Sequence, residues 1–263
     1  MRQAHVLLHH VSFTHTAAST PLFTDVTAHF PLGWTGIVGA NGAGKTTLLH
    51  LATGILLPQQ GAVQAPADAL YCPQRTESVP ALFMEFLQAT DGEVYTLKGR
   101  LGITDDWLQR WQTLSHGERK RAQLGVALWR QPPVLAVDEP TNHLDAEAHQ
   151  MISAALQAFV GVGLLVSHDR ALLDALCCQC LFLDPPTAIL RPGGVTQGMQ
   201  QAQIEAEHLR QQAALARSER LRLEQEASAR REEASRAHAK RSKRSLDRKD
   251  HDARGKQPGS CDR

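Results

Sequence analysis

Eight consecutive residues carry the chemistry of phosphate binding. Residues 39–46 have the sequence GANGAGKT, which fits the pattern G-x-x-x-x-G-K-[ST] and lies between an apolar run and a helical pattern. Glycines let backbone N–H groups converge on phosphate oxygens, Lys45 adds a positive charge toward the β- and γ-phosphates, and the Thr46 hydroxyl is a ligand for Mg²⁺. We expect these residues and the adjacent threonine to bind a nucleotide: Gly39, Ala40, Asn41, Gly42, Ala43, Gly44, Lys45, Thr46 and Thr47.

Two adjacent carboxylates end a second apolar run. Residues 134–137 are Val-Leu-Ala-Val, and Asp138 and Glu139 follow them directly. Neighbouring residues of a strand project to opposite faces, so we expect the two carboxylates to have different tasks. We assign Asp138 to Mg²⁺ and Glu139 to the attacking water, as general base.

Two further polar residues follow apolar stretches. Gln74 follows residues 69–73, and its amide suits contact with Mg²⁺ or with the attacking water. His168 follows residues 161–167 and suits donation to a γ-phosphate. We therefore add Gln74 to the metal and catalytic residues and His168 to the catalytic ones.

The elements that must position these residues form an α/β pattern. Residues 35–39, 134–138 and 161–167 are apolar runs that end at polar residues or glycine, which is typical of buried parallel strands. Ligands of such sheets bind outside the carboxyl ends of the strands. Residues 6–13 and 25–30 have mixed β character and predict a small antiparallel sheet.

Composition sets limits on the class of protein. The chain has 263 residues, of which 42% are hydrophobic and 21% are charged, so it is globular. The longest apolar stretch, 160–166, is far shorter than a membrane helix, and we expect a cytoplasmic protein without direct membrane insertion. The clustered cysteines Cys177, Cys178 and Cys180 lack the spacing of a zinc site, and we expect them to be buried and structural.

The last quarter of the chain differs from the rest. Residues 199–263 carry 16 Lys and Arg against 11 Asp and Glu, whereas residues 1–198 are mildly acidic. Helix-forming residues dominate 199–250, which we predict to be a charged, basic helix, and we expect 251–263 to be disordered. The predicted nucleotide-binding domain is therefore 1–198, and the basic tail favours a polyanionic partner.

Residues 114–118, Leu-Ser-His-Gly-Glu, form a helix capping box in which Ser115 and Glu118 are three apart. The same residues resemble the signature motif of ATP-binding cassette (ABC) ATPases. The other motifs occur in the family's order: the loop at 39–46, Gln74, the signature, Asp138-Glu139, Leu144-Asp145 and His168. The resemblance covers about residues 5–190. It implies a P-loop NTPase cassette, with a mostly parallel sheet, a small antiparallel β-subdomain and a short helical subdomain, followed here by a long helical tail.

The resemblance also implies partners and further site residues. In this family two cassettes pair head to tail, and ATP lies between the phosphate loop of one and the signature of the other. Ser115, Gly117, Glu118 and Asp145 are then expected to meet a nucleotide held by a second cassette, from a homodimer or a partner chain. His116 replaces a glycine of the usual signature, and His15 takes the place of an aromatic residue that stacks on adenine.

Residues 139–145, EPTNHLD, and 167–170, SHDR, resemble the soluble ABC-F branch, whose members act on ribosomes as translation factors or antibiotic-protection proteins. The chain resembles a first cassette of that branch plus the start of its interdomain linker. We expect a soluble ATP hydrolase whose basic tail contacts ribosomal RNA. The alternative is the ATP-binding subunit of a membrane transporter. A chromosome-maintenance head domain is excluded because no coiled coil separates Lys45 from Asp138.

Overall fold

The structure, a computed structural model, describes residues 5–16 and 18–253. The chain divides into two compact units, Met1–Gln201 and Ala202–Arg263. The first unit holds all of the strands and the candidate site residues, and the second consists of one helix in its described part.

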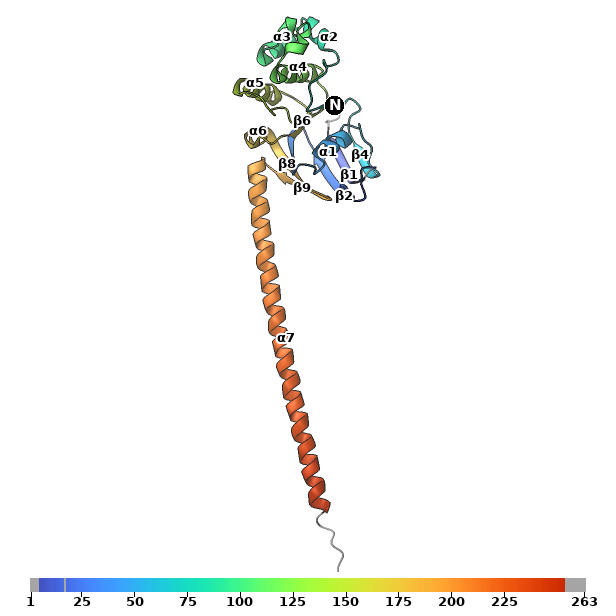
Figure 1. Cartoon of the computed structure of the whole chain (residues 1–263), viewed down its shortest axis with the longest axis vertical. Helices are drawn as coiled ribbons and strands as arrows, with labels where there is room; N and C mark the ends of the chain where they lie inside the picture. The colour runs from blue at the N-terminus through green and yellow to red at the C-terminus, as the bar shows by residue number, and fades with distance from the viewer. Residues whose placement is uncertain (1–4, 17, 254–263) are drawn as a thin grey trace, which may run out of the picture. The chain divides into compact units, whose positions relative to one another are not determined.

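A six-stranded sheet forms the centre of the first unit (Figure 1). Its first five strands are parallel, and β9 pairs antiparallel with β8. The strands in spatial order are β5 (Leu70–Cys72), β6 (Val134–Asp138), β7 (Val162–Val166), β3 (Gly33–Gly39), β8 (Cys177–Asp184) and β9 (Thr187–Pro192). The predicted parallel strands at 35–39, 134–138 and 161–167 are confirmed as β3, β6 and β7, which are neighbours.

These central strands are buried on both faces. Every residue of β6 and β7 is buried. Alternate residues of β6 enter two separate cores: Leu135 and Val137 pack with the helical side, and Val134 and Ala136 pack with α1 and the small sheet. A continuous apolar run is therefore the pattern that this position in the sheet requires.

A separate three-stranded antiparallel sheet packs through the second of these cores. Its order is β2 (Phe23–Phe30), β1 (Val6–Phe13) and β4 (Gln60–Gln64). The predicted pairing of 6–13 with 25–30 is confirmed, and β4 adds a third strand. Alternating burial along β1 and β2 directs their apolar side chains to the core.

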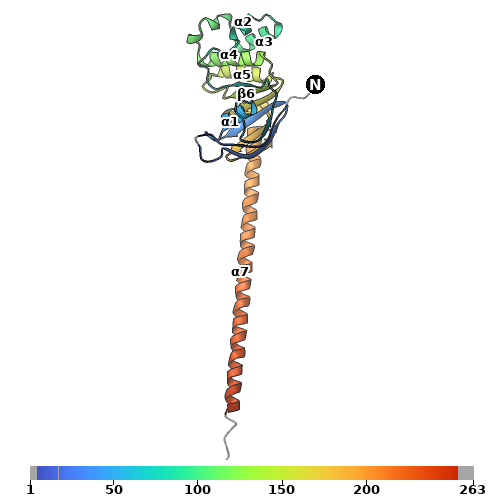
Figure 2. The same ribbon diagram turned by 90° about the vertical axis from the view of Figure 1, so that its right-hand side faces the viewer.

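Helices cover the sheet and build a helical subdomain. α2, α3 and α4 lie together at one end of the first unit, where α4 contacts both α2 and α3 (Figure 2). The helices of the first unit are α1 (Lys45–Ala52), α2 (Phe83–Gln88), α3 (Gly92–Leu101), the 3₁₀ turns η1 (Asp105–Leu108) and η2 (Trp111–Thr113), α4 (His116–Trp129), α5 (Ala146–Gln157) and α6 (Arg170–Leu176).

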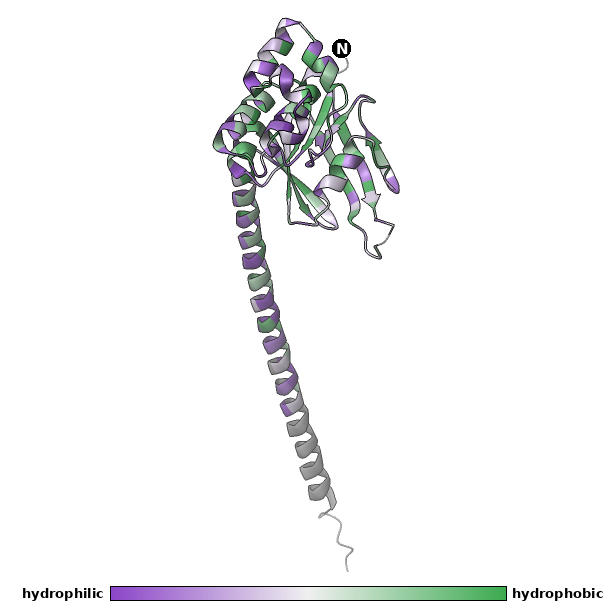
Figure 3. Ribbon diagram, turned by 45° about the horizontal axis from the view of Figure 1, so that its top comes forward, coloured by the Kyte–Doolittle hydropathy of each residue, from purple (hydrophilic) through white to green (hydrophobic). Residues whose placement is uncertain are grey.

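The tail is one uninterrupted helix, α7 (Val195–Ala253), mainly polar along its described surface (Figure 3). Helix was predicted for 199–250; it begins four residues earlier because Gly198 does not interrupt it. A Cβ at Gly198 would lie 2.5 Å from the Phe182 ring, so close packing, and not a turn, requires glycine there. The helix continues through 251–253, which were predicted to be disordered, and residues 254–263 lie outside the described residues.

Two further expectations from the sequence concern the clustered cysteines and membrane-spanning helices. Cys177 and Cys180 are buried, but Cys178 is exposed. The pairing of β8 with β3 passes over Cys178, since Trp34 pairs with Cys177 and Thr35 with Gln179, and this irregularity breaks the alternation of side chains along the strand. In the described part of the chain, none of the helices combines the length and the apolar character that a bilayer crossing requires.

Close packing between β3 and β7 gives a stability prediction. Gly163 is paired with Trp34, and a Cβ at Gly163 would lie 2.3 Å from Cε3 of the buried indole. We expect Gly163→Ala to lower the free energy of unfolding by about 1–3 kcal/mol, as overpacking does. The matched control is Gly99→Ala, where no atom lies within 4 Å, and which should stabilise α3 by about 0.5–1 kcal/mol. Urea unfolding followed by tryptophan fluorescence measures both; equal effects would contradict the packing argument.

Candidate nucleotide-binding site

A cavity of about 700 Å³ lies where β3, β6 and β7 end. This volume is in the usual range for small-molecule sites. Most of the residues predicted from the loop and strand-end motifs line it, as do two polar residues that were not predicted. The polar lining residues are His15, Asn41, Lys45, Thr46, Thr47, Gln74, Asp138, Glu139, Asn142, His143 and His168, and Gly42 and Gly44 complete the loop.

The phosphate loop runs from the end of β3 into α1. Gly42 and Gly44 have φ values of 82° and 89°, a conformation that favours glycine. A Cβ at Gly44 would also lie 2.7 Å from the Leu22 side chain. The Lys45 ammonium donates to the carbonyl oxygens of Gly39 at 3.0 Å and Ala40 at 3.1 Å. The loop thus places a cation and the N-terminus of α1 at the cavity, as phosphate binding requires.

Thr46 and Asp138 form the candidate metal pair. The Thr46 hydroxyl donates to Oδ2 of Asp138 at 2.7 Å, so that two oxygen ligands from different elements lie side by side. Tyr71, on β5, donates its hydroxyl to the same oxygen at 3.1 Å. Hydroxyl and carboxylate oxygens are the ligands that Mg²⁺ prefers, so the donor set fits this ion. Burial and the neighbouring Asp138 carboxylate raise the pKa of Tyr71, which keeps the phenol a hydrogen-bond donor.

Glu139 lies beside Asp138 in the same cavity, whereas strand alternation had predicted opposite faces. The strand ends at Asp138, and Glu139 turns with φ 45° and donates its N–H to the carbonyl of Val166 at 2.9 Å. A non-glycine residue in this region is uncommon and often marks a functional position. The assignment of Asp138 to the metal and Glu139 to the water stays a prediction.

The Glu139 carboxylate faces His168. Oε2 accepts the His168 backbone N–H at 3.2 Å, and Oε1 lies 3.4 Å from Nε2 of the same residue. Oε1 is buried and has no hydrogen-bond partner among the described residues. Burial raises the pKa of the Glu139 carboxyl above its usual value, and the His168 imidazole opposes this shift. A buried carboxylate oxygen that is not hydrogen-bonded is suited to accept a proton from water.

Of three further residues that line the cavity, one was predicted from the sequence and two were not. Gln74 lines the cavity as expected, just after β5 ends at Cys72. Asn142 and His143 also line it, and sequence reasoning gave them no role although they lie in the quoted stretch 139–145. His143 has a φ of 58°, and the spacing of residues in the sequence does not predict a turn of this kind.

His15, expected to stack on adenine, lies at the cavity and is exposed. Its Nε2 lies within hydrogen-bond distance of the Thr47 hydroxyl at 3.1 Å, and its ring meets Phe13 edge-on at 5.1 Å. These two contacts hold the edges of the His15 ring and leave one of its faces suited to stacking on a base. The role of His15 in adenine stacking stays a prediction.

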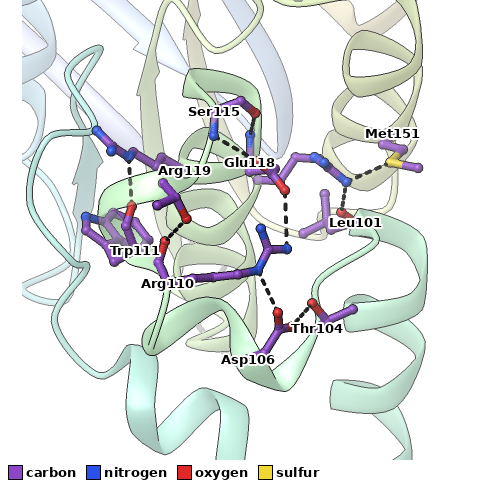
Figure 4. Close-up of polar contacts among 11 residues, drawn as sticks. Leu101, Thr104, Asp106, Arg110, Trp111, Ser115, Glu118, Arg119 and Met151 are labelled. Carbon is purple, nitrogen blue, oxygen red and sulfur yellow. Dashed lines mark hydrogen bonds and ion pairs between the residues drawn. The ribbon is translucent and has the colours of Figure 1, made fainter.

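The signature residues do not line this cavity. Ser115 is the N-cap of α4: its Oγ accepts the Glu118 N–H at 3.2 Å, and its own N–H donates to the Glu118 carboxylate at 2.8 Å. Arg110 bridges Glu118 and Asp106, as Figure 4 shows. The predicted capping box is therefore confirmed, and Ser115 is exposed.

Asp145 has the same structural role at α5, where its carboxylate accepts the Ala148 N–H at 2.8 Å. Gly117 lies close to this second helix start, since a Cβ on it would be 3.4 Å from Leu144 and 3.5 Å from Ala148. The starts of α4 and α5 thus lie next to each other, while Ser115, Gly117, Glu118 and Asp145 are separate from the cavity of Lys45.

The fold and this cavity define a P-loop nucleotide-binding protein. Residues 24–142 match the family described as ABC transporter. A protein of Nitratidesulfovibrio vulgaris that is named as an ABC transporter ATP-binding protein is 32% identical in an alignment of 203 positions that covers 66% of this chain and 74% of that protein. The chain belongs to the ABC family of ATPases.

Two longer relatives are matched over one part of their length. The ribosome protection protein VmlR of Bacillus subtilis is 34% identical over 59% of this chain and 27% of its own length. The ATP-binding cassette sub-family F member 2 of the mouse is 29% identical over 72% of this chain and 32% of its own. The chain thus spans about a quarter to a third of these relatives. Among solved structures, a bacterial Atm1-family ABC exporter with ATP bound has the same fold, with a TM-score of 0.64 at 21% identity over 81% of this chain and 42% of that one.

The position of Lys45 predicts the effect of removing its charge. We expect Lys45→Ala to weaken ATP binding by about 10–100-fold or more, because a charge-assisted phosphate contact contributes about 1.5–3 kcal/mol. Calorimetric titration with Mg-ATP measures the change, and Arg100→Ala, an exposed position on α3, is the control. An unaltered dissociation constant for Lys45→Ala would contradict the assignment of the loop.

Proposed function

We propose that the chain hydrolyses ATP with Mg²⁺ in a composite site formed by two cassettes. The observation that carries the proposal is the separation of its parts. The cavity holds the phosphate loop, the candidate metal pair and Glu139, whereas the signature residues are displayed at the start of α4, away from it. One copy of the chain therefore supplies one half of two different sites, and a second cassette is needed to complete either.

The roles of the residues follow from their positions. Mg²⁺, when bound, neutralises charge on the transferred phosphoryl group and on its leaving oxygens. Thr46 and Asp138 are positioned to hold it, Gln74 to contact it or the water, and Lys45 to bind phosphate oxygens. Oε1 of Glu139 accepts a proton as the water oxygen attacks the γ-phosphorus and the bond to the bridging oxygen breaks. His168, 3.4 Å from that carboxylate, orients it and donates to the γ-phosphate.

The other half of the site comes from the paired cassette. The exposed N-terminus of α4 carries the partial positive charge of a helix start, with the Ser115 hydroxyl and the Gly117 N–H beside it. We infer that these groups meet the γ-phosphate held by the partner's loop. Glu118 supports these groups by fixing the position of Ser115. Asp145 caps the neighbouring helix start, that of α5, and is expected to meet the partner's nucleotide from there.

A mixing experiment tests the composite site. Lys45→Ala removes the loop function, and Ser115→Asp places a negative charge at the signature while preserving an N-cap residue. We expect each variant alone to be inactive in phosphate release. Their mixture should regain about one quarter of the wild-type rate, because half of the randomly formed pairs are mixed and each mixed pair holds one complete site.

The control for this experiment is Thr113→Asp, an exposed position with the same added charge just outside the signature, which should keep its activity. A wild-type rate per chain that does not depend on protein concentration, together with no recovery on mixing, would contradict the composite site.

We further propose that the chain acts in the cytoplasm as an ABC-F-type protein, with a cassette at 1–198 and a linker-like helix at 199–250 that contacts ribosomal RNA. The similarity to VmlR and to the mouse sub-family F protein supports this, as does the long helix α7. The basic cluster of the tail, residues 240–244, has side chains that lie outside the described residues, and its charge is known from the sequence. The name of the Nitratidesulfovibrio relative favours the alternative, a transporter's ATP-binding subunit.

Co-sedimentation with ribosomes separates these two functions. The variant Glu139→Gln keeps the shape of the side chain but removes the base, and it should retain ATP and accumulate in the paired state. We expect it to sediment with ribosomes in the presence of ATP and to dissociate as salt increases. Replacing four basic residues by Gln should make the plot of log affinity against log salt less steep by about 3. These residues are Lys240, Arg241, Lys243 and Arg244.

The matched control neutralises four exposed arginines earlier in α7. These are Arg210, Arg217, Arg220 and Arg222. Association with a membrane protein and not with ribosomes, under the same conditions, would support the transporter alternative and contradict the ribosomal one.

A further inference from the structure

Three side chains on one face of α4 hold the loop that carries Gln74. His116, Lys120 and Gln123 are spaced four and three residues apart, so they form one stripe along the helix. Each contacts the segment 73–76, which follows the end of β5. The helix that displays the signature at its N-terminus therefore binds the Gln74 loop through side chains of its first two turns.

Lys120 is the centre of this stripe. It is 1% exposed, and its ammonium donates to the carbonyl oxygens of Pro73 at 2.7 Å and Gln74 at 3.3 Å and to Oε1 of Gln123 at 3.0 Å. All three of its donors are thus used, and all three acceptors are neutral. Burial lowers the pKa of Lys120, which is the cost of enclosing a charge without a bonded carboxylate.

Gln123 and His116 extend the contact on both sides of Lys120. The Gln123 amide accepts from Lys120 and donates from Nε2 to the carbonyl of Arg75 at 3.1 Å. Nδ1 of His116 lies 3.2 Å from the hydroxyl of Thr76, which is buried. Four consecutive residues, 73–76, are therefore tied to α4 through side chains.

The loop needs these partners because no strand supplies them. The pairing of β5 with β6 ends at Cys72, and residues 73–78 belong to neither helix nor strand. Backbone carbonyls at the edge of a packed region require hydrogen-bond donors. An apolar residue in place of Lys120 would fill the space and leave the carbonyls of Pro73 and Gln74 without this donor.

We propose that Lys120 is a positioning residue that fixes Gln74 to the signature helix, so that α4 and the Gln74 amide move as one body. This inference rests on the proposed function, in which Gln74 serves the metal and the water while the start of α4 serves the partner's nucleotide. Any displacement of α4 on pairing of two cassettes then changes the place of Gln74 in the chain's own cavity. The contact links the two half-sites of one cassette.

The test compares Lys120→Met with Lys98→Met in the full chain. Lys98 is the other lysine that is buried among the described residues, 7% exposed, and donates to the carbonyl of Leu87 and to Asp105 at 3.1 Å within the helical subdomain. Both variants lose a buried, hydrogen-bonded ammonium, and Lys98→Met also removes the ion pair with Asp105, so its effect on thermal stability calibrates a purely structural loss. Lys120→Arg, which keeps donors at the same place, is the conservative variant.

The first readout is the backbone NMR order parameter of residues 74–77 without nucleotide. We expect values of about 0.8 in the wild type and in Lys98→Met, and values below about 0.6 in Lys120→Met. The second readout is kinetic: Lys120→Met should lower kcat by about 10–100-fold, as misplacement of a catalytic group does, and leave the dissociation constant for ATP within about threefold. Lys120→Arg should restore part of kcat.

Equal order parameters and equal kcat for the two methionine variants would overturn the proposal. If Lys120→Met does not fold, Gln123→Ala decides, because it removes one acceptor of Lys120 and the donor to Arg75 without adding a charge; unaltered motion at 75–77 would then overturn the proposal. A wild-type chain that does not hydrolyse ATP would contradict the proposed function alone, since the order parameters still test the contact of Lys120.

Discussion

Parallel pairing of β6, β7 and β3 is the constraint on which the site depends. Asp138 pairs with Val166, and Val166 pairs with Ile37, so β6 and β7 end together and β3 continues for two more residues at the same edge. The chain leaves each strand at that edge with different chemistry: a glycine loop after β3, two carboxylates at the end of β6, and His168 just after β7. Both faces of these strands are buried, so a shift in register would cost apolar packing in two cores at once.

Much of this arrangement was predictable because it depends on covalent spacing. Residues 39–46 determine their own loop, since glycines at fixed positions permit the left-handed backbone at Gly42 and Gly44. Apolar runs that end at Asp138 and near His168 indicate buried strands, and parallel strands bring their ends to one edge. The sequence therefore predicted which strands meet and most of the residues that line the cavity, although not Asn142 and His143.

The remainder depends on contacts that spacing does not encode. Asp138 and Glu139 enter the same cavity because the strand ends between them and Glu139 adopts φ 45°, whereas alternation along an unbroken strand would have separated them. Tyr71 reaches Asp138 only because β5 pairs with β6. Gly198 lies inside α7, where the close approach of the Phe182 ring requires a residue without a side chain.

The two ends of α4 are governed by opposite requirements. Its N-terminus is exposed, and the capping box of Ser115 and Glu118 satisfies the helix within its own first turn, which leaves that surface available to a second cassette. From Lys120 onward the helix is mostly buried, and its polar groups are used within the chain. A packed helix such as α4 moves as a unit more easily than it bends. A displacement of its exposed N-terminus is therefore transmitted to the residues packed along its buried part. The buried ammonium of Lys120 lies where these two regions meet, one turn below the signature and against the carbonyl of Gln74. The cost of burying that charge is therefore offset by hydrogen bonds that make the position of Gln74 depend on the position of the signature.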